Sequence, residues 1–158
     1  MPDRPQDMYT RDREPVPAFD PGEVFYVRVH PSTIQPENTV DPVHVPCPDL
    51  SSNRSGFSQP WYVLYPTENY GGWAVFMFRV QEVLPAVSSI NPGGGEPVVY
   101  DVTTAHDPEV DNFAHCETRL YRGTERMAPN KVSKGAKKVF REHMSRILQL
   151  NRVAGEPL

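Results

Sequence analysis

The sequence predicts an α+β fold in which a mostly antiparallel sheet of four to five strands packs against one C-terminal amphipathic helix. Three observations lead to this fold class. The chain has 158 residues, the size of one domain with a single hydrophobic core. Its 18 prolines exclude an all-helical bundle, because proline interrupts the helical hydrogen-bond ladder. Short β-branched and aromatic runs are separated by turn residues, and only the C-terminal part repeats its apolar residues at helical spacing.

The two ends of the chain are expected to be tails around a single domain. The first 22 residues are rich in proline and mixed charges and carry few large apolar side chains. Burial therefore cannot offset the entropy of ordering them. We predict a flexible N-terminal tail over residues 1–22, one α+β domain over 23–152 and a C-terminal tail over 153–158.

Five stretches have the composition and alternation that are typical of strands. They are residues 24–30, 61–65, 73–80, 98–102 and 114–122. The third is the most apolar run of the chain and is expected to be the central strand. In the fifth, one face is expected to carry Cys116, Thr118 and Leu120, and the other His115, Glu117, Arg119 and Tyr121.

Two segments between these strands are expected to be irregular. Residues 31–60 contain six prolines and no sustained period. We expect a long connection there, a type of loop that often carries function. The glycines at 93–95 predict a flexible hairpin tip, because they lack the following Lys-Ser/Thr and helix of a phosphate-binding loop.

One helix is predicted, starting near Ser133, which is a suitable N-cap. Apolar side chains recur at steps of three and four and form one stripe, whereas lysines and arginines occupy the remaining surface. The stripe consists of Val132, Ala136, Val139, Phe140, His143, Ile147 and Leu150. The helix is expected to pack on the sheet.

The charge distribution is uneven although the net charge is only -4. Between Lys131 and Arg152 there are seven basic residues and one acidic residue, and between Asp101 and Glu117 there are five acids and no Lys or Arg. Such patches either complement each other and solubilise the fold or form a contact surface. The contact surface would bind nucleic acid or an acidic partner through Lys131, Lys134, Lys137, Lys138 and Arg141.

The cysteines and the apolar runs bear on location. Cys47 and Cys116 are too far apart in sequence for a CxxC redox pair, and two cysteines cannot form a four-thiolate zinc site. No apolar run has the length of a signal peptide core or of a membrane helix. We expect a cytoplasmic protein with free thiols and no membrane contact.

Three groups of residues are candidates for chemistry. Arg28 and His30 share a strand face, which suits anion binding or proton transfer but is also typical of a solvated face. The loop that contains Ser52 and Arg54 offers hydroxyl and guanidinium groups for phosphate or ribose, or for capping its own backbone. On the last strand His115 and Glu117 point the same way and can orient each other or act on one substrate atom. Their spacing is not that of a zinc motif, so no metal site is expected.

Complete catalytic motifs are absent from the sequence. The chain contains no GxGxxG, Walker loop, HExxH or GxSxG. These absences exclude the dehydrogenases, P-loop NTPases, kinases, zincins and α/β-hydrolases that depend on such motifs.

Residues 50–55 read Leu-Ser-Ser-Asn-Arg-Ser, and residues 112–117 read Asn-Phe-Ala-His-Cys-Glu. With these two motifs the chain resembles a scattered set of small uncharacterised bacterial proteins. They share an arginine-bearing first strand, a Leu-Ser-x-Asn-Arg-Ser-like loop and an Asn-x-x-His-x-Glu-like strand. The resemblance covers about residues 24–122. It implies a bacterial protein and transfers no activity.

The chain also resembles compact ADP-ribosyltransferase-like toxins, which pair an early Arg or His with a Ser/Arg loop and a late Glu around an NAD cleft. Under this resemblance Arg28 or His30 would line the cleft with Ser52 and Arg54. Glu117 would polarise the ribose hydroxyl, and NAD would be a substrate rather than a cofactor. The chain departs from the family because it has neither a Ser-Thr-Ser triad nor a Glu-x-Glu pair.

The sequence thus leaves three hypotheses for function. The first is a non-catalytic accessory or protein-interaction protein without a cofactor, which contacts its partner through the basic helix face or the proline-rich loop 31–60. The second is an NAD-consuming toxin or effector, whose site residues would converge in one cleft: Arg28, His30, Ser52, Arg54, His115 and Glu117. The third is a nucleic-acid-binding protein that uses the basic helix, with an affinity that falls steeply with salt.

Overall fold

The computed structural model describes residues 4–89 and 95–151 and confirms an α+β fold with an antiparallel sheet and one main helix. The strands are β1 (Val24–Val29), β2 (Asp49–Arg54), β3 (Ala74–Arg79), β4 (Ala86–Ser89), β5 (Val98–His106), β6 (His115–Arg122), β7 (Glu125–Arg126) and β8 (Gln149–Leu150). The helices are α1 (Thr67–Tyr70) and α2 (Lys134–Ile147). Within the described residues the sheet therefore has eight strands, so the predicted number of four to five is wrong.

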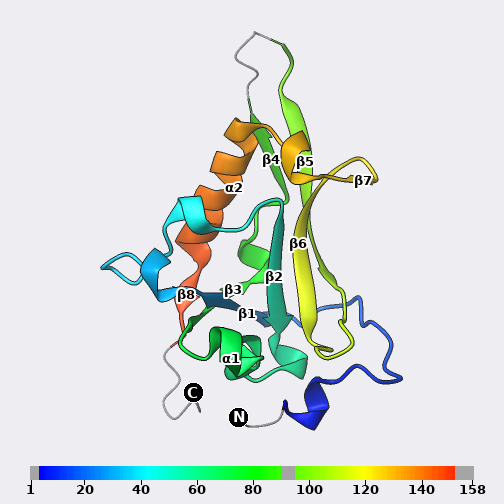
Figure 1. The fold of residues 1–158 in the computed structure, drawn as a ribbon. Coiled ribbons are helices and arrows are strands. Elements are labelled where there is room, and N and C mark those ends of the chain that lie inside the picture. Colours follow the sequence, from blue (N-terminus) through cyan, green and yellow to red (C-terminus); the bar gives the residue numbers. More distant parts are fainter. Residues whose placement is uncertain (1–3, 90–94, 152–158) are drawn as a thin grey trace.

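The strand order brings distant parts of the chain together. From edge to edge it is β4-β5-β6-β2-β1-β3-β8, with β7 paired to the end of β6 and all neighbours antiparallel. The sheet curls, so that β1 and β3 run across the direction of β2 and β6 (Figure 1). β3, the expected central strand, is separated from the edge only by the two-residue β8. The centre of the sheet is formed by β6 and β2 instead.

The hydrophobic core lies between one face of the sheet and α2. Its largest fully buried side chains include Phe25, Phe76, Phe78, Leu50 and Leu120 from the sheet and Phe140 and Met144 from α2. A smaller cluster forms on the opposite face, where Trp61, Val63 and Leu64 pack on Val75 and Trp73. Each face of the curled sheet is thus partly covered by apolar side chains.

The predicted helix is confirmed as α2. The Ser133 Oγ accepts a hydrogen bond from the Ala136 N–H at 3.3 Å and caps its first turn. The helix ends at Ile147, and Leu150, expected in its apolar stripe, lies in β8 opposite Phe76. The end of the helix at Ile147 was not predicted, because Leu150 continues the helical spacing of apolar residues although it lies in an extended segment.

Residues 61–65, expected to be a strand, form a 3-10 helix over Pro60–Leu64. Pro60 occupies its first position, where the ring fixes a helical φ and no N–H donor is needed. Tyr62, Val63 and Leu64 are buried in succession, which the alternating sides of a half-covered strand do not provide. The prediction is therefore wrong for this segment, whose apolar run forms a cap on the sheet.

The segment 31–60, expected to be irregular, contains β2. The sequence of β2 is polar throughout apart from Leu50, so its composition does not indicate a strand. Its ladder with β6, which runs from Asp49 opposite Arg119 to Asn53 opposite His115, provides the order that the local sequence lacks. Before β2 the chain forms two 3-10 turns that begin at prolines, Pro31–Thr33 and Pro42–His44.

The β4–β5 hairpin was predicted only in part. β4 follows Pro85 and has four residues, too few for a visible alternation. β5 continues to His106, four residues beyond the predicted end. Most of the expected glycine hairpin tip lies outside the described residues.

Residues 4–22 pack on the domain, in contrast to the flexible tail expected for 1–22. Met8 is 1% exposed. The Met8 carbonyl accepts a hydrogen bond from the Phe113 N–H, and the Val16 N–H donates to His106 Nδ1 at 2.8 Å. These contacts with the β5–β6 hairpin provide the stabilisation that the composition of the segment lacks. The C-terminal tail expected over 153–158 lies outside the described residues.

Candidate functional site

A row of cations follows one face of α2. Burial of Phe140 and Met144 against the sheet fixes the rotation of the helix and so the direction of this face. Positions i, i+3, i+4 and i+7 of the row are Lys134, Lys137, Lys138 and Arg141. The row covers about 10 Å of helix axis at a rise of about 1.5 Å per residue. Its beginning coincides with the positive end of the helix dipole, which adds to the positive potential.

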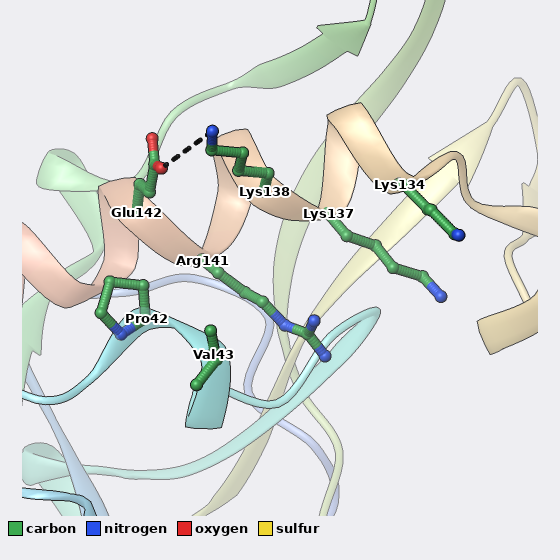
Figure 2. Close-up of a pocket in the computed structure, with 7 residues that line it drawn as sticks. All are labelled: Pro42, Val43, Lys134, Lys137, Lys138, Arg141 and Glu142. Atoms are coloured by element: carbon green, nitrogen blue, oxygen red, sulfur yellow. Dashed lines mark ion pairs between the residues drawn. The ribbon is translucent and has the colours of Figure 1, made fainter.

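The proline-rich segment forms the opposite wall of a groove along this row. Its 3-10 turn Pro42–His44 begins after Asp41, whose Oδ1 accepts a hydrogen bond from the Val43 N–H at 3.1 Å. This cap directs Val43 outward, and 66% of its surface is exposed. The groove, of about 260 Å³, is lined by Pro42, Val43, Lys134, Lys137, Lys138, Arg141 and Glu142 (Figure 2). We call it the basic groove.

The side chain of Arg141 is held in place by the segment that forms the opposite wall of the groove. Its Nε–H donates to the Val45 carbonyl at 2.9 Å, which fixes the plane of the guanidinium beside the 3-10 turn. No hydrogen bond or ion pair with another described residue occupies its two terminal nitrogens. A guanidinium with a fixed plane and open terminal N–H groups is oriented for a two-pronged contact with a carboxylate or phosphate.

The charges of the groove are only slightly compensated. Glu142 is the single acid among the lining residues, and its Oε1 lies 3.9 Å from Lys138 Nζ. In Figure 2 Lys138 turns toward Glu142, whereas Lys134, Lys137 and Arg141 extend together to the other side. This exposed pair is worth little, and three cations remain beside an apolar wall.

Lys131, the fifth cation predicted for this surface, does not line the groove. It ends the 3-10 turn Pro129–Lys131, before the start of α2, and is exposed. Pro42 and Val43 were not predicted individually as contact residues. Both lie in the proline-rich loop 31–60, which was expected to be a contact surface instead of the basic helix face. The basic helix face and the proline-rich loop, expected as two alternatives, are therefore the two walls of one groove.

His115 and Glu117 do form the predicted pair, on the sheet face away from α2. The His115 Nε2 lies 3.1 Å from Glu117 Oε1, and its Nδ1 lies 2.7 Å from the Asp107 carbonyl oxygen. Both ring nitrogens thus face acceptors, which favours the imidazolium because only this form donates from both. The Ser51 hydroxyl donates to the same Glu117 oxygen at 2.8 Å, and Glu109 Oε1 lies 3.6 Å from His115 Nε2.

The electrostatics of this pair agree with its geometry. Burial lowers the pKa of His115, but its hydrogen bonds with Glu117 and Asp107 and the nearby carboxylates outweigh burial, so the net shift is upward. For Glu117 burial raises the pKa, and the hydrogen bonds from His115 and Ser51 outweigh it, so the net shift is downward. The two groups stabilise each other in their charged forms.

Arg54 does not lie on this face, whereas Ser52 lines a polar pocket together with His115. Ser52 and Arg54 share the side of β2 that carries Leu50, and Ser52 lies opposite the buried Cys116. The guanidinium of Arg54 forms an ion pair with Glu23, and both side chains are nearly inaccessible. The charge of Arg54 is therefore compensated within the fold, which does not support the interpretation of this segment as a phosphate-binding loop.

Arg28 and His30 lie on β1 and just after it. Arg28 Nη1 donates to the Val63 carbonyl at 3.1 Å, and its guanidinium stacks on the ring of Tyr70. Arg28 and His115 together line a polar pocket of about 90 Å³, which neither Glu117 nor His30 lines. The structure thus brings Arg28, Ser52 and His115 to one pocket, with Glu117 beside His115, but it does not bring all six predicted residues into one cleft.

Comparison with known proteins identifies no relative, because no family model, no curated protein and no solved structure matches the chain. Neither resemblance suggested by the sequence is therefore tested, and both stay predictions. No helix in the described part of the chain is both long and apolar enough to cross a membrane. The described His, Cys, Asp and Glu side chains form no group of three suited to a metal ion.

Proposed function

We propose that the protein is a non-catalytic interaction protein whose basic groove binds an acidic segment of a partner protein. The observation that carries this proposal is that Lys134, Lys137 and Arg141 extend to the same side of α2 and line one groove with the exposed Val43. Carboxylates would neutralise the cations, and an apolar side chain between them would cover Val43 and Pro42. Both contacts are needed for a specific rather than a purely electrostatic association.

The groove favours a peptide over a nucleic acid. None of its seven lining residues is aromatic, so bases would find no stacking surface. The chain as a whole carries a net charge of -4, which repels a polyanion at long range but has less effect on a short peptide. The 10 Å row of cations corresponds to about three extended residues at about 3.3 Å each.

The NAD-consuming alternative has less geometric support. It needs Arg28, Arg54 and Glu117 around one cleft, but Arg54 faces Glu23 on the other side of the sheet. The observation that remains in its favour is the His115–Glu117 pair beside the Arg28 pocket. Its direct test compares NAD consumption by the wild-type protein with that by Glu117→Gln. The alternative requires consumption by the wild type and its loss in the variant.

Chemical-shift mapping tests the proposal. The probe is a blocked synthetic peptide of about six residues with alternating Glu and Leu, titrated into the full chain labelled with ¹⁵N. We expect shifts of amides in the first two turns of α2 and around Val43, with few elsewhere. Shifts spread over the whole surface, or shifts produced by a single-stranded oligonucleotide and not by the peptide, would reject the proposal.

A further inference from the structure

The sheet opens between β1 and β2. Their ladder stops after Phe25 opposite Arg54 and Tyr26 opposite Asn53, although β1 continues to Val29 and β2 begins at Asp49. In Figure 1 the two strands leave this point in nearly perpendicular directions. The curl of the sheet thus produces a wedge between two neighbouring strands, with no backbone pairing across it in the described residues.

An apolar pocket of about 290 Å³ occupies this wedge. Its inner wall is made of core-facing side chains from β1, β2, the 31–46 connection and the end of α2: Val27, Val29, Val40, Val45, Leu50 and Leu148. All six are buried, so the pocket extends from the hydrophobic core itself. Its volume is close to the lower end of the range for small-molecule sites, which are mostly apolar with a few polar groups at the edge.

The opening of the pocket carries basic groups. His30 and His44, both exposed, line it together with Arg28 and Trp73, and none of its lining residues is acidic. The His30 Nδ1 accepts a hydrogen bond from the Ser32 N–H at 3.1 Å, so the proton of the neutral ring is on Nε2, which is then a donor. The guanidinium of Arg28 is turned toward the Val63 carbonyl and the Tyr70 ring, so the two histidines are the basic groups available at this opening.

We propose that this pocket binds a small monocarboxylate with an apolar body, inserted between Val29 and Leu50, and with its carboxylate at His30 and His44. The buried apolar wall offers no hydrogen-bond partner to water, whereas it can cover an apolar body. The absence of acids from the lining favours an anionic head over a cationic one. The pocket is separate from the basic groove, although both are bordered by the segment that runs from Val40 to Val45.

The fluorescence of Trp73 provides the test. The chain has two tryptophans, so the Trp61→Phe variant leaves Trp73 as the only reporter. The probe is octanoate, with acetate and octylammonium as matched ligands that lack the apolar body or reverse the charge. We expect a saturable change in emission with octanoate, and binding at least about tenfold weaker with either matched ligand.

Three further measurements keep the test specific. Intermolecular NOEs from octanoate to the methyl groups of Val29 and Val45 would locate the ligand without relying on a core variant. His30→Gln, at an exposed position, should weaken octanoate binding about fivefold. The double variant Lys134→Glu/Lys137→Glu, which removes two competing cations of the basic groove and leaves the bond from Arg141 to Val45 in place, should leave octanoate affinity unchanged.

The outcomes that overturn the proposal are distinct. No saturable response to millimolar octanoate means that the pocket is only a packing defect. Equal affinity for octanoate and octylammonium rejects the anionic head group. NOEs at the first two turns of α2 together with loss of binding in Lys134→Glu/Lys137→Glu would assign the ligand to the basic groove instead.

Discussion

Arg54 and Glu23 form a two-pronged buried ion pair, with Arg54 Nε 3.0 Å from Glu23 Oε1 and Nη2 3.0 Å from Oε2. The remaining donors of the guanidinium contact the carbonyls of Val16 and Ala18. Glu23 in turn accepts from the N–H groups of Gly56 and Asp20. One guanidinium thus attaches the segment before β1 to the end of β2.

Arg54→Ala should lower the free energy of unfolding by about 3–5 kcal/mol, because it leaves the Glu23 carboxylate buried without its partner. Urea denaturation measures the change. The matched control is Arg79→Ala, whose partner Glu82 is 3.7 Å away in an exposed pair and whose loss should cost at most about 1 kcal/mol. Equal costs for the two variants would contradict the role assigned to Arg54.

The same variant should loosen the segment that precedes β1. Without the contacts of Arg54 with the Val16 and Ala18 carbonyls, backbone amides near these residues should exchange faster with solvent. Hydrogen exchange measured under conditions where Arg54→Ala is still folded tests this. Unchanged protection of residues 16–20 would mean that other contacts hold the segment.

The His115–Glu117 pair should make stability depend on pH in a defined direction. The pKa of His115 is raised above 6.5, so its contribution is fully present below that pH and is lost as the pH rises through the folded value. The pKa of Glu117 is lowered below 4.5, so its contribution is present above that pH and is lost as the pH falls through the folded value. The pair therefore stabilises most between about pH 4.5 and 6.5.

Thermal unfolding of wild type and His115→Gln at a series of pH values measures this effect. The difference in Tm between the two should be largest between the two ordinary pKa values and should shrink toward alkaline pH. A difference that is constant from pH 5 to about pH 9 would show that His115 contributes through packing and not through its charge.

Gly135 allows α2 to approach β4. A Cβ at this position would lie 2.8 Å from the Ser89 Cβ, which is too close for two carbon atoms unless one of them shifts. Gly135→Ala should therefore destabilise by about 1–3 kcal/mol in spite of the better helix propensity of alanine. In the Ser89→Gly background the same substitution should be neutral or stabilising. Chemical denaturation of the wild type, the two single variants and the double variant measures this difference. Gly72→Ala, where no atom is within 4 Å, is the control.

Local signals were sufficient for some elements of the fold. In β6 the alternation of His115 and Glu117 with Cys116 and Thr118 separates a polar face from the face that packs on the core, and the structure confirms these faces. In α2 the cap at Ser133 and the apolar stripe are likewise properties of neighbouring residues. Such signals come from residues that are close together in the sequence. They can therefore be recognised without knowing which distant elements pack against the strand or the helix.

The remaining elements depend on contacts between residues far apart in sequence. β2 is polar and becomes a strand only between β1 and β6. The pairing of Arg54 was not predicted because its partner Glu23 is 31 residues away, and a free and a paired arginine have the same local sequence. The basic helix face and the proline-rich loop were predicted as two separate surfaces. The hydrogen bond from Arg141 to Val45, which joins them into one groove, connects residues 96 positions apart in the sequence.

The most direct test of the account is the affinity of the acidic Glu/Leu peptide for charge-reversal variants, measured by fluorescence anisotropy at physiological salt. Lys137→Glu/Arg141→Glu should weaken binding by about tenfold or more, because it replaces two groove cations by anions. Lys131→Glu, which changes the charge beside the groove without lining it, should weaken binding by no more than about twofold. Equal losses for Lys131→Glu and for either groove substitution made singly would show only long-range attraction and would contradict the proposed groove.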